Sequence, residues 1–373
     1  MLIQLAITGL LVALLPLAIV LTSNDTDKYR KLIWVTLFLT FDLIVFGAFT
    51  RLTDSGLGCP DWPGCYGQAN PLQAHTDIRA AEALMPSGPV TVVKAWIEMI
   101  HRYLAMAVGV LIIAIMVVAW RRWLNSGRKL TSYMPVIPTF LFLLVCVQGA
   151  FGAWTVTMKL QPIIVTIHLL LGLTLLGTLA ILASLHSARS AVAPAAKTLY
   201  LPALLALCLL AAQIVLGGWV STNYAVLACT DFPLCHGKLI PPMDFEHGFT
   251  LWRELGKAST GEFLSFEALT AIHWVHRNFA FIVIALVAWI ALKARKIDGL
   301  RKFGKWILII IVAQFASGVS TIYFSWPIAI ALMHNGGAAL LTLLFVLLIY
   351  KTKPMVVTGA DDGNRTHGSS LGS

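Results

Sequence analysis

Charged side chains are scarce in this sequence. They make up 12% of its 373 residues, roughly half the share found in soluble domains, while hydrophobic residues make up 58%. This composition excludes an ordinary soluble enzyme. The apolar residues form continuous runs longer than the ~18 residues that cross a bilayer as a helix, and they lack the alternation of membrane barrel strands. The sequence therefore predicts an all-α polytopic membrane protein.

Acidic residues are the rarer charge, 17 against 27 lysines and arginines, which gives a net charge of +10. The basic residues lie in short segments between apolar runs, so they indicate membrane topology and exclude nucleic acid as a partner. Membrane lipid is the expected surrounding. Nine spans are predicted, at about 2–22, 31–50, 93–120, 134–157, 162–186, 198–222, 264–292, 306–325 and 327–350.

The basic segments follow the first, third, fifth and seventh spans, so the positive-inside rule places them and the C-terminal tail in the cytoplasm. The first run has no basic segment before it and no small-residue cleavage site after it, which favours a retained helix over a signal peptide. The tail from about 354 is polar and is predicted to be disordered. We expect a multi-pass protein of a bacterial inner membrane, with the two long loops in the periplasm.

Cysteine is also rare, and four of the six cysteines stand in the two long loops, as Cys59/Cys65 and Cys229/Cys235. In an oxidising compartment such pairs are expected to form disulfides, and the neighbouring prolines bend the chain as a small loop needs. Metal binding is the alternative, although only His236 lies beside a pair. Cys146 and Cys208 lie inside spans and are predicted to be small apolar filler.

The cysteine loops belong to a longer internal repeat. FGAFTRLTDSGLGCPDWPGCYG (46–67) aligns with LGGWVSTNYAVLACTDFPLCHG (216–237), and MIHRYLA (99–105) aligns with WVHRNFA (274–280). Gln148, Gly152 and His168 align in the same way with Gln314, Gly318 and His334. The chain therefore contains two four-helix units in parallel orientation, and the first apolar helix lies outside both.

Four of the ten histidines fall inside spans at repeated positions: His101, His168, His276 and His334. Ionisable residues at membrane depth are costly and usually functional. His101, His168 and His334 are expected at similar depth, and two such imidazoles on facing helices of one unit can hold a planar macrocycle from both sides. Haem is favoured, because neutral imidazole is a common axial ligand of haem iron. A proton relay and a copper or zinc site are the alternatives.

Two further residue types accompany the histidines. Arg102 and Arg277 follow the first histidine of each unit and are candidates for a haem propionate, with a snorkelling interfacial arginine as the alternative. Glu98 lies three residues before His101, on the same helix face, whereas the second unit has His273 at that position. A carboxylate beside haem can take up protons, so the first unit is predicted to be reactive and the second to be a static cofactor site. A merely solvated Glu98 is the alternative.

Together, the segment GAFTRLTDSGLGCPDWPGCYG, the EMIHR run (98–102), TIHLLLG (166–172), the His-Arg pair at 276–277 and LMHNGG (332–337) resemble the haem A synthase family over residues 31–350. The resemblance implies two pseudo-symmetric four-helix bundles plus the extra N-terminal helix. It also implies oxidation of the haem O ring methyl to a formyl group, which gives haem A.

By the family pattern, His276 and His334 ligate the iron of a resident haem b, and His101 and His168 face the iron of the substrate haem O. Glu98 is the catalytic carboxylate, and Cys59/Cys65 has a redox or structural role. His273 could compete as a ligand, but His276 aligns with His101 and precedes the arginine. The implied partners are haem O synthase and the cytochrome oxidase assembly machinery, and a homo-oligomer is left open.

The expected organisation divides the chain into four parts: residues 1–30 with the extra helix, 31–190 for the substrate haem, 191–353 for the resident haem b, and 354–373 as the tail. Three other functions remain open. A b-type cytochrome for quinol-linked electron transfer also needs paired histidines, but does not explain Glu98 in one unit only. A membrane thiol oxidase leaves the histidines unexplained, and a transporter predicts no bound chromophore.

Overall fold

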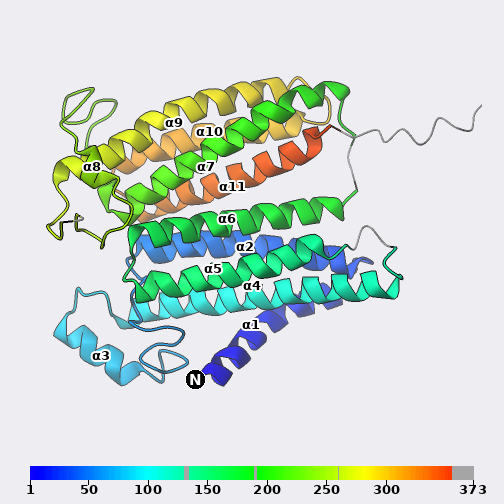
Figure 1. Ribbon diagram of the computed structural model, residues 1–373, viewed down its shortest axis with the longest axis horizontal. Helices are drawn as coiled ribbons and strands as arrows, with labels where there is room; N and C mark the ends of the chain where they lie inside the picture. The colour runs from blue at the N-terminus through cyan, green and yellow to red at the C-terminus, as the bar shows by residue number, and fades with distance from the viewer. Residues whose placement is uncertain (130–133, 189–190, 259, 355–373) are drawn as a thin grey trace, which may run out of the picture.

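The computed structural model describes residues 1–129, 134–188, 191–258 and 260–354. Within these residues the regular elements are helices, running side by side along the long axis of the molecule (Figure 1). The long helices are α1 (Leu2–Thr22), α2 (Lys28–Leu52), α4 (Val92–Asn125), α5 (Val136–Thr157), α6 (Pro162–Leu185), α7 (Tyr200–Thr222), α9 (Phe266–Ala294), α10 (Arg301–Tyr323) and α11 (Ile328–Thr352). The short ones are α3 (His75–Leu84), α8 (Phe245–Gly248) and the 3₁₀ turns η2 (Pro194–Leu199) and η3 (Ala225–Leu227).

Nine helices in the described part of the chain are long and apolar enough to cross a membrane, which confirms the predicted spans. Several begin at a side-chain cap: Asp27, Thr91 and Ser265 each accept a hydrogen bond from a backbone N–H of the first turn. The helices reach further into the basic segments than predicted. α2 begins at Lys28 and α10 at Arg301, because long basic side chains can extend from a helix end to the polar boundary.

The helices form two four-helix bundles that lie one above the other in Figure 1. In the first, α2, α4, α5 and α6 contact one another in a closed ring, so α4 and α6 are diagonal partners. In the second, α7, α9, α10 and α11 form the equivalent ring, with α9 and α11 diagonal. The all-α architecture and the two bundles agree with the prediction from the internal repeat.

The interface between the bundles follows the repeat. α2 packs on α11, α6 packs on α7, and α6 also contacts α11. Since α2 corresponds to α7 and α6 to α11, the first two contacts are images of each other, as in a two-fold symmetric dimer. One continuous hydrophobic core runs through both bundles and this interface.

Polar residues join the bundles at the end that carries the cysteine loops. Arg51, at the end of α2, donates to the Ser221 carbonyl oxygen of α7 and pairs with Asp54 at 3.1 Å. Its guanidinium lies 4.2 Å from the centre of the Tyr224 ring, and the Tyr224 hydroxyl donates to Asp54 at 2.8 Å. In the repeat alignment Arg51 corresponds to Ser221 and Asp54 to Tyr224, so each residue meets its own counterpart and the group lies on the pseudo-two-fold axis.

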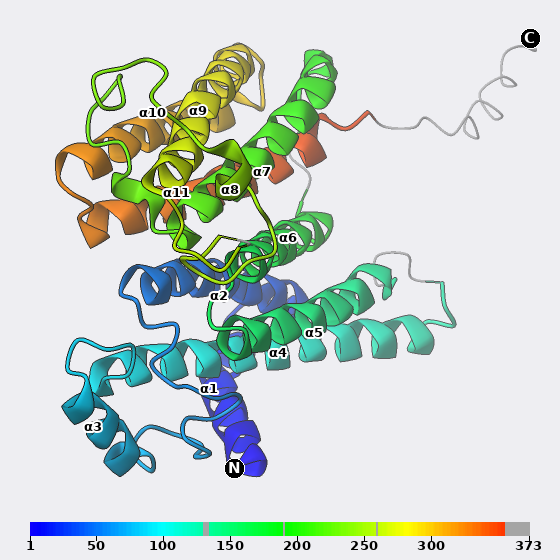
Figure 2. The same ribbon diagram turned by 60° about the vertical axis from the view of Figure 1, so that its left-hand side comes forward.

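The extra helix α1 packs against α4 and, more weakly, α2 (Figure 2). Its first turns lie near the first cysteine loop, where Leu5 is buried in one small hydrophobic cluster with Cys59, Cys65 and Met99. The second bundle has no corresponding helix among the described residues. The helix thus covers one flank of the first bundle.

The long loops contain structure that the sequence did not predict. α3 packs Ile78 into the cluster beneath the first loop, and α8 contacts α9. Cys146 and Cys208 are exposed on the helix surface and so do not fill the interior. The predicted disordered tail lies outside the described residues, except for its first residue.

Candidate functional site

The four span histidines lie on the diagonal helices of the two bundles. His101 follows the start of α4 by 9 residues and His276 follows the start of α9 by 10. His168 and His334 each follow the start of their helices, α6 and α11, by 6 residues. The two histidines of each bundle thus stand at similar heights on diagonal helices, which pairs His101 with His168 and His276 with His334.

All four imidazoles are surrounded by protein atoms, yet each retains partly accessible surface. Part of each ring is therefore left uncovered by the protein. Bundle cores bounded by facing side chains are common cofactor sites. The described residues contain no group of three or more His, Cys, Asp or Glu side chains able to hold a metal ion. Two imidazoles without a third protein ligand suit a haem, which brings four nitrogen ligands of its own.

A glycine on the neighbouring helix stands against each imidazole. A Cβ atom at Gly47 would lie 3.0 Å from Nε2 of His101, and one at Gly217 would lie 2.9 Å from Cε1 of His276. A Cβ atom would have slightly more room at the other two glycines. It would lie 3.2 Å from Cε1 of His168 at Gly152 and 3.3 Å from Cε1 of His334 at Gly318. The repeat alignment marks these glycines, but their spacing alone does not reveal that they make room for the imidazoles.

Hydrogen bonds orient the histidines of the second bundle. Nδ1 of His276 lies 3.1 Å from the Gln213 amide nitrogen, and Nδ1 of His334 lies 2.9 Å from the Ser317 hydroxyl. A ring nitrogen that donates a hydrogen bond leaves the other nitrogen free for a metal. The Ser317 hydroxyl donates to the Gln314 carbonyl oxygen and so accepts from Nδ1 of His334, which leaves Nε2 of that ring for a ligand between the two helices. The Gln213 amide nitrogen instead donates to Nδ1 of His276, so the ring proton lies on Nε2 and iron binding there requires the other tautomer.

The histidines of the first bundle are less constrained. Nδ1 of His168 and Oε1 of Gln148 are buried without a hydrogen-bond partner in the described chain. The contact between Nε2 of His168 and the Gln148 amide nitrogen is long, at 3.4 Å, and His101 makes no hydrogen bond with a described residue. Orphaned polar atoms of this kind indicate a partner that is not part of the protein.

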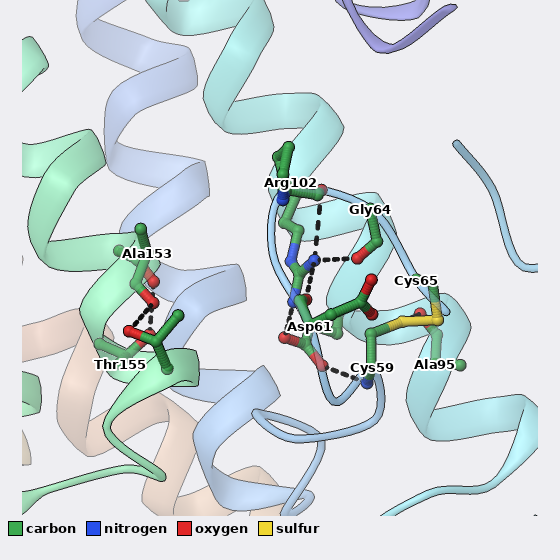
Figure 3. A network of polar contacts seen from close by, with 12 residues as sticks. Cys59, Asp61, Gly64, Cys65, Ala95, Arg102, Ala153 and Thr155 are labelled. Carbon is green, nitrogen blue, oxygen red and sulfur yellow. Dashed lines mark hydrogen bonds and ion pairs between the residues drawn. A yellow bond between two sulfur atoms is a disulfide. The ribbon is translucent and has the colours of Figure 1, made fainter. Parts of the chain in front are cut away.

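Glu98 and Arg102 hold the first cysteine loop (Figure 3). The Cys59 backbone N–H donates to Glu98 at 2.8 Å, and Glu98, which is 4% exposed, also pairs with Arg102. The Arg102 guanidinium points into the loop between the two cysteines, where it donates to the carbonyl oxygens of Asp61 at 3.0 Å and of Gly64. The carboxylate predicted to be catalytic is thus buried against the loop.

The second cysteine loop is held by the equivalent positions. The Cys229 N–H donates to Nδ1 of His273 at 3.2 Å, so His273 replaces Glu98 as the acceptor. Arg277 donates to the carbonyl oxygens of Asp231 at 2.7 Å and of Leu234 at 2.8 Å. Both arginines are therefore already hydrogen-bonded to their loops, a contact that the sequence did not predict, and propionate binding by them stays a prediction.

Both loops are closed by disulfides, with Cys59 bonded to Cys65 and Cys229 to Cys235, and all four cysteines are 0% exposed. An aspartate organises each loop: Asp231 accepts from the backbone N–H groups of His236 and Gly237, as Asp61 does in the first loop. The Gly237 N–H is the largest cause that lowers the pKa of Asp231; desolvation opposes it, and the His236 N–H adds to the lowering. These loops are compact caps on the two bundles.

Fold and site together define a polytopic membrane protein built from two histidine-bearing four-helix bundles. Residues 30–346 match the family model of the cytochrome oxidase assembly protein, COX15-CtaA, and the chain belongs to this family. It is 39% identical to the Heme A synthase of Shewanella oneidensis over 86% of this chain and 95% of that protein. It is 28% identical to the Heme A synthase of Methylobacterium radiotolerans over 84% of this chain and 87% of that protein. It is 25% identical to the Heme A synthase of Halalkalibacterium halodurans over 83% of this chain and 90% of that protein.

Proposed function

We propose that this chain is a haem A synthase, an oxidoreductase that converts the ring methyl of haem O to a formyl group. Family membership and the 39% identical relative support this activity. The observation that carries the proposal is the asymmetry between two otherwise equivalent bundles. Each has a pair of imidazoles on diagonal helices, but only the first has a carboxylate, Glu98, where the second has His273.

The second bundle is assigned to a resident haem b, with His276 and His334 as its ligands. A hydrogen bond at Nδ1 fixes the orientation of each ring, from the Gln213 amide to His276 and from His334 to the Ser317 hydroxyl, and rings held in place in this way suit a permanent cofactor. A haem b held there would supply one-electron redox chemistry. The residues fit this group, and the protein's own part is to fix the two rings and exclude water.

The first bundle is assigned to the substrate haem O, between His101 and His168. Nδ1 of His168 is unpartnered, whereas Nδ1 of His276 and of His334 each have a hydrogen bond, and this looser ring suits a group that enters and leaves. Oxidation of the methyl to the alcohol takes up the oxygen of a water and releases two electrons and two protons, and oxidation of the alcohol to the aldehyde releases two more of each. The electrons leave one at a time, as the redox chemistry of a haem b held in the second bundle would allow, and Glu98 takes up protons that are released. Arg102 pairs with Glu98 and holds the loop, so it positions this carboxylate.

Because Glu98 accepts a hydrogen bond from Cys59, it could also have a purely structural role in holding the loop. The residue at the same position in the second bundle suggests a variant that distinguishes the structural role from the catalytic one. Glu98→His introduces the acceptor found at His273, so it keeps the loop contact but removes the carboxylate. We expect Glu98→His and Glu98→Ala to retain haem b and to lower haem O conversion about 100-fold or more, the usual size of an acid–base contribution.

Conversion is measured by chromatography of haems extracted from protein expressed with a haem O supply. Normal haem A output from Glu98→His would reduce Glu98 to a loop anchor. His276→Ala is the matched variant in the other bundle, and it should lose the b-type spectrum. Two equivalents of haem b in the unaltered protein, with no haem O, alcohol or haem A, would instead favour a b-type electron-transfer cytochrome.

A thiol oxidase is less well supported, because exchange requires an accessible sulfur and all four disulfide cysteines are 0% exposed. The positive-inside pattern supports a bacterial inner membrane location with the cysteine loops in the periplasm. We further propose that the chain receives its substrate from haem O synthase and acts with the cytochrome oxidase assembly machinery.

A further inference from the structure

An acidic residue, Asp42, lies on the outer face of α2 at the middle of the membrane. It stands 11 residues after Lys31 and 9 residues before Arg51, the basic residues that mark the ends of this span. At 1.5 Å per residue these are distances of about 16 and 13 Å, which is mid-depth in a hydrocarbon core of about 30 Å. Asp42 is exposed on the helix surface. It forms no hydrogen bond or ion pair with any residue that the structure describes.

The fold does not need this carboxylate. The repeat pairs Gly47 with Gly217, so Asp42 corresponds to Ala212 on α7, which is also exposed. The second bundle therefore builds the same helix position with a methyl group. An ionisable side chain that faces lipid at mid-depth costs free energy and usually marks a functional contact. Asp42 serves something outside the bundle.

A cleft lies on the same face of the molecule. Between α1 and α2, a hollow of about 360 Å³ is lined by apolar side chains, with Lys31 at its foot. Phe38 lines it as well, one helical turn before Asp42. Only the first bundle has α1, so this cleft also belongs to the first bundle alone. The cation of Lys31, an apolar wall and the carboxyl group of Asp42 thus follow one another along α2.

We propose that this face of α1 and α2, centred on Phe38 and Asp42, binds a membrane-spanning helix of another protein that carries a hydrogen-bond donor at mid-depth. A phospholipid could place its phosphate near Lys31 and a chain in the cleft, but an acyl chain offers no donor to Asp42. A second copy of this chain would bring an identical carboxylate. Its described spans expose no lysine, arginine, asparagine or glutamine at this depth. A helix of another protein with a central asparagine can pack on the apolar wall and donate to Asp42.

The test uses the full-length protein in phosphatidylcholine vesicles and three synthetic spanning peptides of leucine and alanine. One peptide has a single asparagine at its centre, one has leucine there, and one has the asparagine near its end. Association is measured by energy transfer between a labelled peptide and the labelled C-terminus. We expect the central asparagine to bind roughly fivefold or more tightly than the other two, which is the size of interhelical hydrogen bonds in membranes.

Asp42→Ala reproduces the Ala212 position and should abolish the preference for central asparagine. The matched control Trp306→Ala changes an exposed residue on α10 and should leave the preference unchanged. Equal binding of all three peptides by the unaltered protein would overturn the proposal without any variant having to fold. If phosphatidylglycerol abolished peptide binding to the unaltered protein but not to Lys31→Gln, the cleft would be a lipid site. A protein dimer that dissociates in Asp42→Ala would make it a self-association surface.

Discussion

Four glycines are as important to this molecule as the four histidines they face. A Cβ atom at Gly217 would approach Cε1 of His276 to 2.9 Å, closer than real side chains pack. Other helix glycines have free space around them, and a Cβ atom at Gly109 on α4 would meet nothing within 4 Å. The two kinds of glycine are alike in sequence and differ only in what stands opposite.

This difference gives a paired prediction. Gly217→Ala should displace the His276 ring. Overpacking of this kind costs about 1–3 kcal/mol. If this cost falls on the state with haem bound, haem affinity drops about fivefold or more. Gly109→Ala should keep full haem content, because it adds a methyl group to a helix with room for it. The measurement is the haem absorbance per protein after purification. Equal haem content in both variants would contradict the account of Gly217.

The sequence predicts which residues line the site better than it predicts where their side chains point. The apolar runs and the duplicated His-Arg pairs predict the helices and the imidazole pairs, because both depend on helical spacing alone. Spacing cannot give the direction of Arg102, whose hydrogen bonds go to loop carbonyls 38–41 residues away in sequence. The contact between Glu98 and Cys59, and the substitution of His273 for Glu98 as acceptor, depend on the folded loop for the same reason.

At the scale of the element, each cysteine loop is a small unit with three attachments. A disulfide closes it, an arginine from the helix below binds its carbonyl oxygens, and an aspartate inside it binds two of its own N–H groups. The last attachment makes the second loop sensitive to acid. The pKa of Asp231 is lowered in the folded loop, first by the Gly237 N–H, so the carboxylate favours the folded loop only while it is ionised.

The sign of the pH effect follows from that direction. A depressed pKa in the folded state gives stability that is present above the ordinary aspartate value of about 4 and is lost as the pH falls through the lower, folded value. We expect the amides of His236 and Gly237 to exchange hydrogen faster as the pH is lowered through this range, relative to a loop peptide. Asp231→Asn should remove that acid dependence. An unchanged pH profile in Asp231→Asn would exclude this carboxylate as its cause.

At the scale of the whole molecule, the two bundles are joined by a continuous apolar core and by one polar group on the pseudo-two-fold axis. The repeat in the sequence predicts two units but not how they face each other. That arrangement depends on side chains such as Arg51 and Tyr224, which lie 170 or more residues apart. The position of α1 on α4 was unpredictable for a similar reason, since it has no counterpart in the second unit.

The polar group on the axis gives a second paired prediction. Arg51→Ala removes the ring contact with Tyr224 and the half-exposed ion pair with Asp54, and should cost about 1 kcal/mol. Arg301→Ala removes an exposed ion pair with Asp298 at the start of α10, and should cost almost nothing. Thermal unfolding in detergent should show a lower Tm for Arg51→Ala only. Equal melting of both variants would mean that the apolar core alone holds the bundles together.

Because the two bundles are parts of one chain, the ratio of the two kinds of site is fixed at one to one. If two identical chains met through this interface, both sites would carry the same acceptor beneath their loops, and any specialisation of one would be imposed on the other. Within a single chain, Glu98 can stand in one site and His273 in the other. Each molecule then contains one site of each kind. Both sites are made whenever the chain is translated, and the packing of the bundles fixes the distance between them. Neither the ratio nor the distance therefore depends on the concentration of subunits.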